Sequence, residues 1–186
     1  MSDYILIIED DPYFSEVLKS IINDKLPNVG VVTINKLSLF VSVLPVLKSF
    51  PPVAILLDLM ISIVDLKEQY PEIKYSDLEG GLSCIKLLNE FELTSMVPII
   101  IISAREISMI NKEIEKFSQI VSYITKPIDE ADVERIIEII HSSLSLHGNA
   151  KKRRSENTFE KIFSAIEAKP GVLGFKVDLK KLGIVK

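Results

Sequence analysis

Disulfide bonds, Gly-rich phosphate loops and membrane-spanning runs are all missing from the sequence of this 186-residue chain. The single cysteine, Cys84, cannot form an intrachain disulfide, and no cluster of Cys and His has metal-ligand spacing. Without a Gly-rich Walker loop, nucleotide hydrolysis has no support. The longest apolar runs have four or five residues, whereas a membrane-spanning helix needs about 18. Asp3, Glu9 and Asp10 argue against a signal peptide, so we expect a cytoplasmic protein with no transmembrane segment.

The composition is that of a globular protein with an uneven distribution of charge. Hydrophobic residues make up 47% of the chain and charged residues 26%, which excludes a mainly disordered protein. Residues 1–146 contain 22 Asp and Glu against 12 Lys and Arg, whereas residues 147–186 contain 4 against 10. An acidic body is therefore followed by a short basic tail.

Short apolar stretches rich in Ile and Val alternate with longer stretches that have helical spacing. Strands are predicted at residues 4–8, 29–34, 53–57, 97–102 and 120–124. Helices are predicted at residues 12–26, 36–49, 81–91, 105–117 and 129–146. The unbroken apolar runs at 54–57 and 99–102 are typical of parallel strands that helices cover on both faces. Five such strand–helix units predict an α/β protein with a doubly wound parallel sheet.

Two segments depart from this alternation. Residues 61–79 show no buried periodicity and carry five acidic residues against two lysines. Connections longer than about 12 to 15 residues are usually functional or disordered. In the tail, residues 147–157 form a predicted linker that contains the basic run 151–154. The apolar residues of a predicted short amphipathic helix follow at Phe159, Ile162, Phe163 and Ile166.

Four predicted strands are each followed by one or more polar or charged residues that could bind a ligand or act in catalysis. In chain order these residues are Glu9, Asp10 and Asp11 after the first strand, Asp58 after the third, Ser103 after the fourth and Lys126 after the fifth. Ligand sites in open α/β sheets lie beyond the carboxyl ends of the strands. If the first and third strands are neighbours, the carboxylates converge at one edge of the sheet.

Such a cluster would suit the transfer of a phosphoryl group. Neighbouring carboxylates repel one another strongly, and Mg²⁺ is a cation that binds carboxylates together with waters and phosphate oxygens. Asp58 would accept a phosphoryl group as an aspartyl phosphate. The metal, Lys126 and the Ser103 hydroxyl would share the three phosphoryl oxygens and offset their charge.

Each residue also has a structural interpretation. Asp11, which precedes Pro12, is predicted to be a helix N-cap, so the chemistry is assigned to Glu9 and Asp10. Ser103, with Glu in the third position after it, matches a capping box and could be a cap, a ligand or both. Asp58 alone could cap a loop. One shared site explains the four strand ends more simply than four unrelated roles do.

Four segments of the sequence together resemble the receiver domain of two-component response regulators. They are Ile5 to Pro12 (ILIIEDDP), Leu56 to Met60 (LLDLM), Ile101 to Ala104 (IISA) and Tyr123 to Pro127 (YITKP). The resemblance covers residues 1–146 and implies a flavodoxin-like fold with strand order 2-1-3-4-5 and helices on both faces, followed by a short C-terminal extension. It also implies a protein of two-component signal transduction that is not an enzyme, except in catalysing its own phosphorylation and dephosphorylation.

The resemblance also assigns a role to each site residue. Asp58 would be the phosphoacceptor for a sensor histidine kinase or phosphotransfer protein, with Ser103 and Lys126 contacting the phosphoryl group. The expected cofactor is Mg²⁺, and its expected ligands are Glu9, Asp10, Asp58 and the backbone carbonyl of Met60. Ser103 and Tyr123 would form the switch that presents an output surface to a downstream protein partner. The Lys126–Pro127 bond is expected to be cis.

The sequence departs from the family at two places. Residues 61–80 are longer than the usual loop by roughly 15 residues, an insertion that chain entropy tolerates. Residues 147–186 are too few for a winged-helix or helix-turn-helix domain, so direct DNA binding is not expected and a homodimer is an option.

The sequence leaves two other functions open. One is a receiver-like scaffold that binds partners without switching, and the other is an aspartate-nucleophile phosphatase, which Met60 disfavours because a second Asp is needed there.

Overall fold

The computed structural model describes residues 3–69, 80–91, 97–106, 108 and 114–150. Its centre is a five-stranded parallel sheet with the strand order β2-β1-β3-β4-β5. The strands are β1 (Tyr4–Ile8), β2 (Gly30–Ile34), β3 (Ala54–Leu57), β4 (Ile99–Ser103) and β5 (Ile120–Thr125). The predicted doubly wound fold and its strand order are confirmed.

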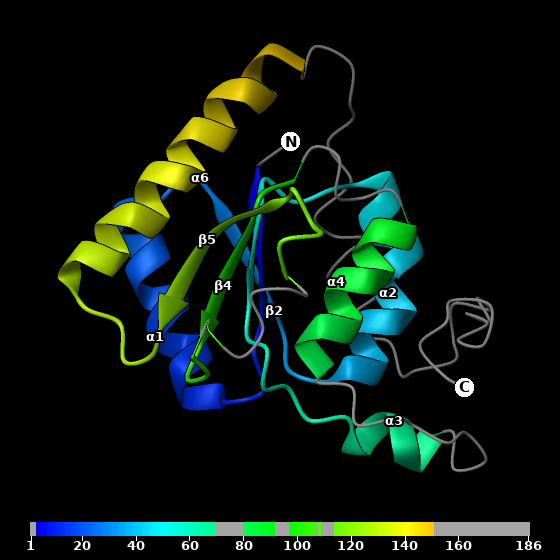
Figure 1. Ribbon diagram of the computed structural model, residues 1–186. Coiled ribbons are helices and arrows are strands. Elements are labelled where there is room, and N and C mark those ends of the chain that lie inside the picture. The colour runs from blue at the N-terminus through cyan, green and yellow to red at the C-terminus, as the bar shows by residue number, and fades with distance from the viewer. Residues whose placement is uncertain (1–2, 70–79, 92–96, 107, 109–113, 151–186) are drawn as a thin grey trace.

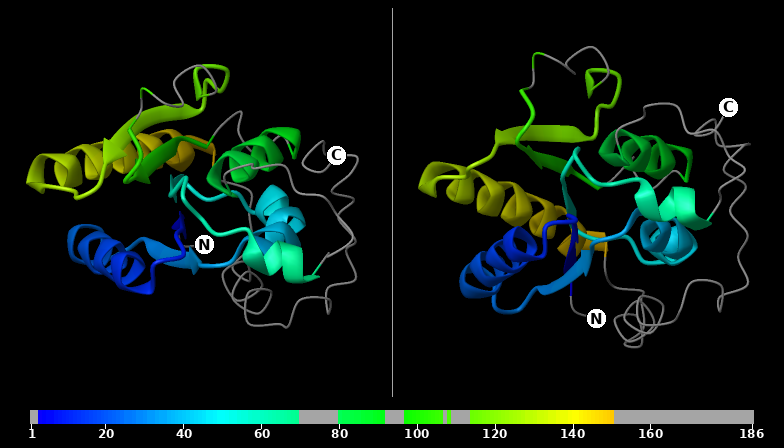
Figure 2. Two further views of the ribbon diagram at one scale, coloured as in Figure 1. Left: turned by 60° about the horizontal axis from the view of Figure 1, so that its bottom comes forward. Right: turned by 90° about the horizontal axis from the view of Figure 1, so that it is seen from below.

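Helices cover both faces of the sheet (Figure 1). One face is covered by α1 (Pro12–Lys25) and α6 (Glu130–Ala150), and the other by α2 (Leu37–Ser49) and α4 (Gly80–Glu90). The two layers are seen from other directions in Figure 2. A short helix, α3 (Val64–Gln69), contacts α2. Among the described helices, none is both long and apolar enough to cross a membrane.

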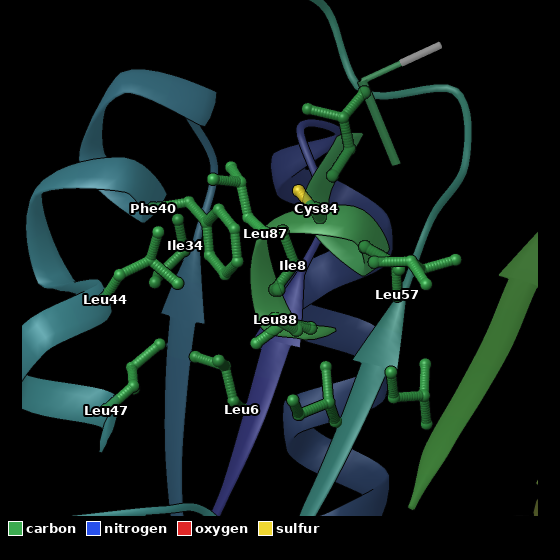
Figure 3. Close-up of a cluster of buried hydrophobic side chains, with 14 of the residues drawn as sticks. Leu6, Ile8, Ile34, Phe40, Leu44, Leu47, Leu57, Cys84, Leu87 and Leu88 are labelled. Carbon is green, nitrogen blue, oxygen red and sulfur yellow. The ribbon is translucent and has the colours of Figure 1, made fainter. Parts of the chain in front are cut away.

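Alternate residues of β1 pack into opposite layers. Ile5 and Ile7 of β1 contact the layer of α1 and α6, whereas Leu6 and Ile8 contact the layer of α2 and α4. All four side chains are at most 1% exposed. In the second layer, Phe40 of α2 fills the space between the two helices and the sheet (Figure 3). Burial of each such side chain contributes roughly 1.5 to 3 kcal/mol, which explains why these strands have no polar positions.

Most predicted boundaries are correct to within two residues. The strand expected to begin at residue 97 begins at Ile99, because the preceding Pro98 has no N–H to donate. Helix α6 continues to Ala150, four residues beyond its predicted end at 146. The helix α3 lies in a segment for which no helix was predicted. The expected helix at 105–117 falls largely outside the described residues, as does the tail from residue 151.

The start of α2 depends on a side chain from α3. Lys36 occupies the N-cap position of α2, and a lysine side chain has no acceptor with which to cap a helix. Instead, the Asp65 carboxylate accepts a hydrogen bond from the backbone N–H of Ser38 at 2.7 Å. A negative charge at this end also interacts favourably with the helix dipole. The beginning of the insertion is therefore tied to the body of the domain.

We predict that Asp65→Ala lowers the free energy of unfolding by about 1 kcal/mol, the usual contribution of a helix cap. Glu68→Ala is the matched control, because Glu68 is an exposed acid on the same short helix, and it should change stability by less than about 0.5 kcal/mol. Urea unfolding followed by circular dichroism measures both. Equal effects of the two substitutions would contradict the capping role.

Candidate functional site

The carboxyl ends of β1 and β3 bring three carboxylates together. These two strands are hydrogen-bonded neighbours with Ile8 opposite Leu57, so the residues that follow them share one edge of the sheet. One carboxylate oxygen from each of Glu9, Asp10 and Asp58 lies within 4.8 Å of the other two. Glu9 and Asp58 are buried, with 3% and 6% of their surfaces exposed. The predicted convergence of these acids is therefore found.

Lys126 joins two of these carboxylates. Its Nζ lies 2.7 Å from Oε2 of Glu9 and 2.8 Å from Oδ2 of Asp58. It also lies 4.2 Å from the centre of the Phe14 ring, an arrangement that favours a cation. The Lys126–Pro127 peptide bond is cis, as expected. One lysine, placed two strands away from Asp58, thus reaches the whole buried acid pair.

The charges of the cluster do not balance. Burial, together with the nearby charge of Asp58, raises the pKa of Glu9 to about 7, although the hydrogen bond from Lys126 lowers it. Burial alone would lower the pKa of Lys126, but its hydrogen bonds to Asp58 and Glu9 outweigh this and raise it. Three carboxylates face one ammonium group, so the site carries an excess of negative charge that a cation would offset.

The donor set fits a hard divalent cation. Mg²⁺ binds oxygen ligands and is held through one or two carboxylates, with water and phosphate oxygens completing its shell. Glu9, Asp10 and Asp58 offer such oxygens at one point. Asp58 is oriented by the backbone N–H of Met60, which donates to its Oδ1 at 2.9 Å. The role of the Met60 carbonyl as a ligand stays a prediction.

Ser103 presents a buried hydroxyl group at the end of β4. The residue is 0% exposed, and its Oγ has no hydrogen-bond partner among the residues that the structure describes. An unsatisfied buried hydroxyl costs roughly 1 to 3 kcal/mol. The predicted capping box gains no support, because Glu106 accepts from Ser108 Oγ at 3.4 Å and not from this segment's own amide groups. The free hydroxyl therefore favours the ligand interpretation of Ser103.

Tyr123 lies close to the segment that follows Ser103. It is partly buried on β5, and it packs against the core on the side of α2 and α4. Its hydroxyl group donates a hydrogen bond to the backbone carbonyl of Arg105. This bond links the predicted aromatic switch to the chain two residues beyond Ser103.

Sequence reasoning missed how the insertion meets the site. The backbone N–H of Ser62 donates to Oδ2 of Asp10 at 2.9 Å, so the first residues of the insertion contact the carboxylate cluster. The two ends of the insertion lie against each other, since a Cβ on Gly80 would be only 2.2 Å from the carbonyl oxygen of Ile61. A Cβ on the next residue, Gly81, would be 2.4 Å from the carbonyl oxygen of Asp58. No sequence signal reports such backbone contacts.

Asp11 has the structural role that its sequence context predicts. Its Oδ1 accepts hydrogen bonds from the backbone N–H groups of Tyr13 and Phe14 at 2.9 and 3.2 Å. It therefore caps α1, with Pro12 in the first turn. Although it directly follows Glu9 and Asp10, it is not part of the carboxylate cluster.

No protein-family model matches this sequence, and no curated protein sequence does. Solved structures do match it. The receiver domain of a sensor histidine kinase from Pseudomonas aeruginosa, solved with a magnesium ion coordinated in its active-site cleft, is 20% identical, with a TM-score of 0.54, over 76% of this chain and 99% of that one. The receiver domain of a DNA-binding response regulator from Colwellia psychrerythraea is 18% identical, with a TM-score of 0.56, over 75% and 98% of the two chains.

A third match is a CheY-like response regulator receiver domain from Methylobacillus flagellatus. It is 19% identical, with a TM-score of 0.52, and the match covers 75% of this chain and 99% of that one. All three structures are matched over nearly their whole length. The chain therefore has the fold of a response regulator receiver domain, as the four sequence segments predicted.

Proposed function

We propose that this chain is a phosphorylation-switched signalling domain that accepts a phosphoryl group on Asp58. The observation that carries the proposal is the Lys126 bridge between Glu9 and Asp58, whose carboxylates also lie within 4.8 Å of that of Asp10. The buried Ser103 hydroxyl, at the end of the neighbouring strand β4 and with no partner in the described chain, supports it further. The donor would be a phosphohistidine of a sensor histidine kinase or phosphotransfer protein. The reaction would depend on Mg²⁺ held by Glu9, Asp10 and Asp58, with the Met60 carbonyl as a further ligand.

The transfer step exchanges one bond for another at phosphorus. A carboxylate oxygen of Asp58 forms the new O–P bond while the N–P bond to the donor imidazole breaks, and the electron pair stays on that nitrogen. Mg²⁺, held by Glu9, Asp10 and Asp58, would supply positive charge that offsets the phosphoryl oxygens. Lys126 Nζ, already 2.8 Å from Asp58, keeps a second positive charge beside the acceptor throughout. The cluster thus suits a dianionic phosphoryl group once a cation is present.

Phosphorylation would change the hydrogen bonds that hold the switch. As an acyl phosphate, Asp58 no longer offers the same anionic oxygen to Lys126, so the ammonium is free to contact the phosphoryl group. The Ser103 hydroxyl gains an acceptor that it lacks in the described chain. Movement of Ser103 toward that acceptor shifts Arg105, whose carbonyl holds Tyr123. The phosphorylated surface near β5 would then be read by a downstream protein in the cytoplasm.

The alternative, a receiver-like scaffold that does not switch, has less support. A constitutive binder has no use for a partly buried Lys126 paired with two buried acids, since such pairs are costly to desolvate. It also has no use for a buried hydroxyl that lacks a partner.

The phosphatase hypothesis fails for a simpler reason. Met60 stands where a phosphatase would need its acid–base Asp, and the Met60 side chain is 57% exposed.

We predict that the wild-type chain gains one phosphoryl group when it is incubated with Mg²⁺ and an acyl phosphate or phosphoramidate donor. Intact-protein mass spectrometry measures the gain, and EDTA should abolish it. Asp58→Asn should remove it, whereas Asp11→Asn should retain it, because Asp11 caps α1 and lies outside the cluster.

A gain in the Asp58→Asn variant would contradict the assignment of the acceptor. If the wild type gains nothing, a variant in which residues 62–79 are replaced by a short Gly/Ser linker repeats the test. This excision is feasible because Ile61 and Gly80 lie against each other. An unmodified excised variant would overturn the proposal, whereas a modified one would show that the insertion controls access by the donor.

Ser122 is a matched control for testing whether the Ser103 hydroxyl contacts the phosphoryl group. Both are buried and lack a hydrogen-bond partner among the described residues, but only Ser103 lies at the carboxyl end of its strand. We predict that Ser103→Ala and Ser122→Ala each leave stability unchanged or raise it by up to about 1 to 3 kcal/mol, because an unsatisfied polar group is removed. Only Ser103→Ala should reduce the phosphorylated fraction, by roughly tenfold or more.

The measurement combines urea unfolding with the intact-mass time course for the two variants. Equal phosphorylation of Ser103→Ala and the wild type would show that the hydroxyl does not contact the phosphoryl group. A loss of stability in Ser103→Ala would show instead that the hydroxyl group has a structural partner.

A further inference from the structure

An apolar groove lies between β5 and the second half of α6. Its volume is about 430 Å³. The residues that line it include Pro98, Val121, Glu138, Ile139, Ser142 and Leu146. Four of these six are apolar, and the Oγ of the neighbouring Ser143 is already bonded to the carbonyl of Val53. Few polar groups are thus left to recognise a polar ligand, so the groove suits apolar side chains.

Two large apolar residues stay exposed at this groove. Val121 is 48% exposed and Leu146 is 75% exposed. The exposure of Val121 results from an irregularity in the sheet: the register of β4 and β5 shifts between Ile99 and Ile100, so that Ile100 pairs with Ser122. Bulges of this kind redirect a side chain at a sheet edge. Val121 is thereby turned out of the core toward α6.

The groove is far from the carboxylate cluster. Pro98 precedes β4 and Val121 is the second residue of β5, so the groove lies at the amino ends of the strands. The carboxylates follow the carboxyl ends of β1 and β3. Helix α6 runs from the end of the sheet where the carboxylates lie to the opposite end, where the helix stops (Figure 1). The residues of the groove are therefore separate from those that take part in the proposed phosphoryl transfer.

We propose that the groove is the docking site for the predicted amphipathic helix at residues 159–166 of the same chain. That segment places Phe159, Ile162, Phe163 and Ile166 at steps of three and four, which makes a single apolar face. An isolated helix of this length is marginal in water and needs a surface on which to bury that face. The groove offers such a surface next to the point where α6 ends.

The connection is long enough for docking within one chain. Eight residues, 151–158, separate the end of α6 from Phe159, and eight extended residues span at most roughly 26 to 29 Å. Glu138, the groove residue farthest from Ala150, lies twelve residues before it, which is about 18 Å along the helix axis. Residues 159–166 can therefore reach every part of the groove.

The charges of the two parts are complementary. The exposed Glu138 lines the groove, and Glu134 lies exposed one turn earlier on the same helix. The tail that would cross this surface begins with Lys151-Lys152-Arg153-Arg154. Docking in cis therefore brings the basic run of the tail back toward the acidic outer face of α6.

A single introduced tryptophan tests this docking, because the chain contains no tryptophan of its own and the fluorescence then reports on that position alone. In full-length Val121→Trp, the indole should be covered by the docked segment and emit at shorter wavelength. Adding Phe163→Asp should shift the emission by several nanometres to longer wavelength, because a charge on the apolar face prevents docking. Adding Ser164→Asp, which places the same charge on the polar face, should cause no shift. Light scattering should show a monomer throughout.

Identical emission with and without Phe163→Asp would overturn the proposal. So would short-wavelength emission that appears only as the protein dimerises, because the occupant would then belong to a second copy. If Val121→Trp fails to fold by circular dichroism, Leu146→Trp carries the same test from the other wall of the groove, where the native side chain is 75% exposed.

Discussion

The double ion pair of Lys126 with Glu9 and Asp58 is the interaction on which the site depends. Its two bonds, 2.7 and 2.8 Å long, join the ends of β1, β3 and β5 across the sheet. The pair neutralises only part of the acidic charge, and burial raises the pKa of Glu9 to about 7. Breaking one partner of a buried pair leaves an uncompensated charge, so the three residues act as a unit. The remaining negative charge is what the proposed cation, and after it the proposed phosphoryl group, would meet.

The sheet sets the positions of Lys126, Glu9 and Asp58, and the helices packed on both of its faces hold those positions rigid. Each of the strands β1, β3 and β4 is buried on both faces, so their carboxyl ends have little freedom to move. Gly80 and Gly81 add a further constraint, because the start of α4 lies directly on the backbone between Asp58 and Ile61. The backbone of Asp58 is thereby in close contact with the start of α4.

Much of this could be predicted from the sequence because the signals are local or topological. Continuous apolar runs identified the buried strands, and the position of each polar residue after its strand located the site at one edge of the sheet. Asp11 was correctly assigned to the helix cap because Asp followed by Pro is a local motif. The structure brings Glu9, Asp10 and Asp58 together and pairs Lys126 with two of them, as these positions predicted, whereas the roles assigned to these residues and to Ser103 stay predictions.

What the sequence could not predict are contacts between segments that are distant in the chain. The cap that Asp65 provides for α2 and the hydrogen bond from Ser62 to Asp10 both join the insertion to the domain through backbone N–H groups. Every residue except proline has such a group, so the residue type does not indicate the contact. The bulge that exposes Val121 is likewise a property of how two strands pair.

The most direct test of the central claim is the chemical identity of residue 58 after phosphorylation and reduction with borohydride. Borohydride reduces the carbonyl carbon of an acyl phosphate, phosphate leaves, and an aspartyl phosphate becomes homoserine. Peptide mass mapping should find homoserine at position 58 of the treated chain and aspartate at positions 10 and 11. Aspartate at position 58, or homoserine at position 10, would contradict the account of this site.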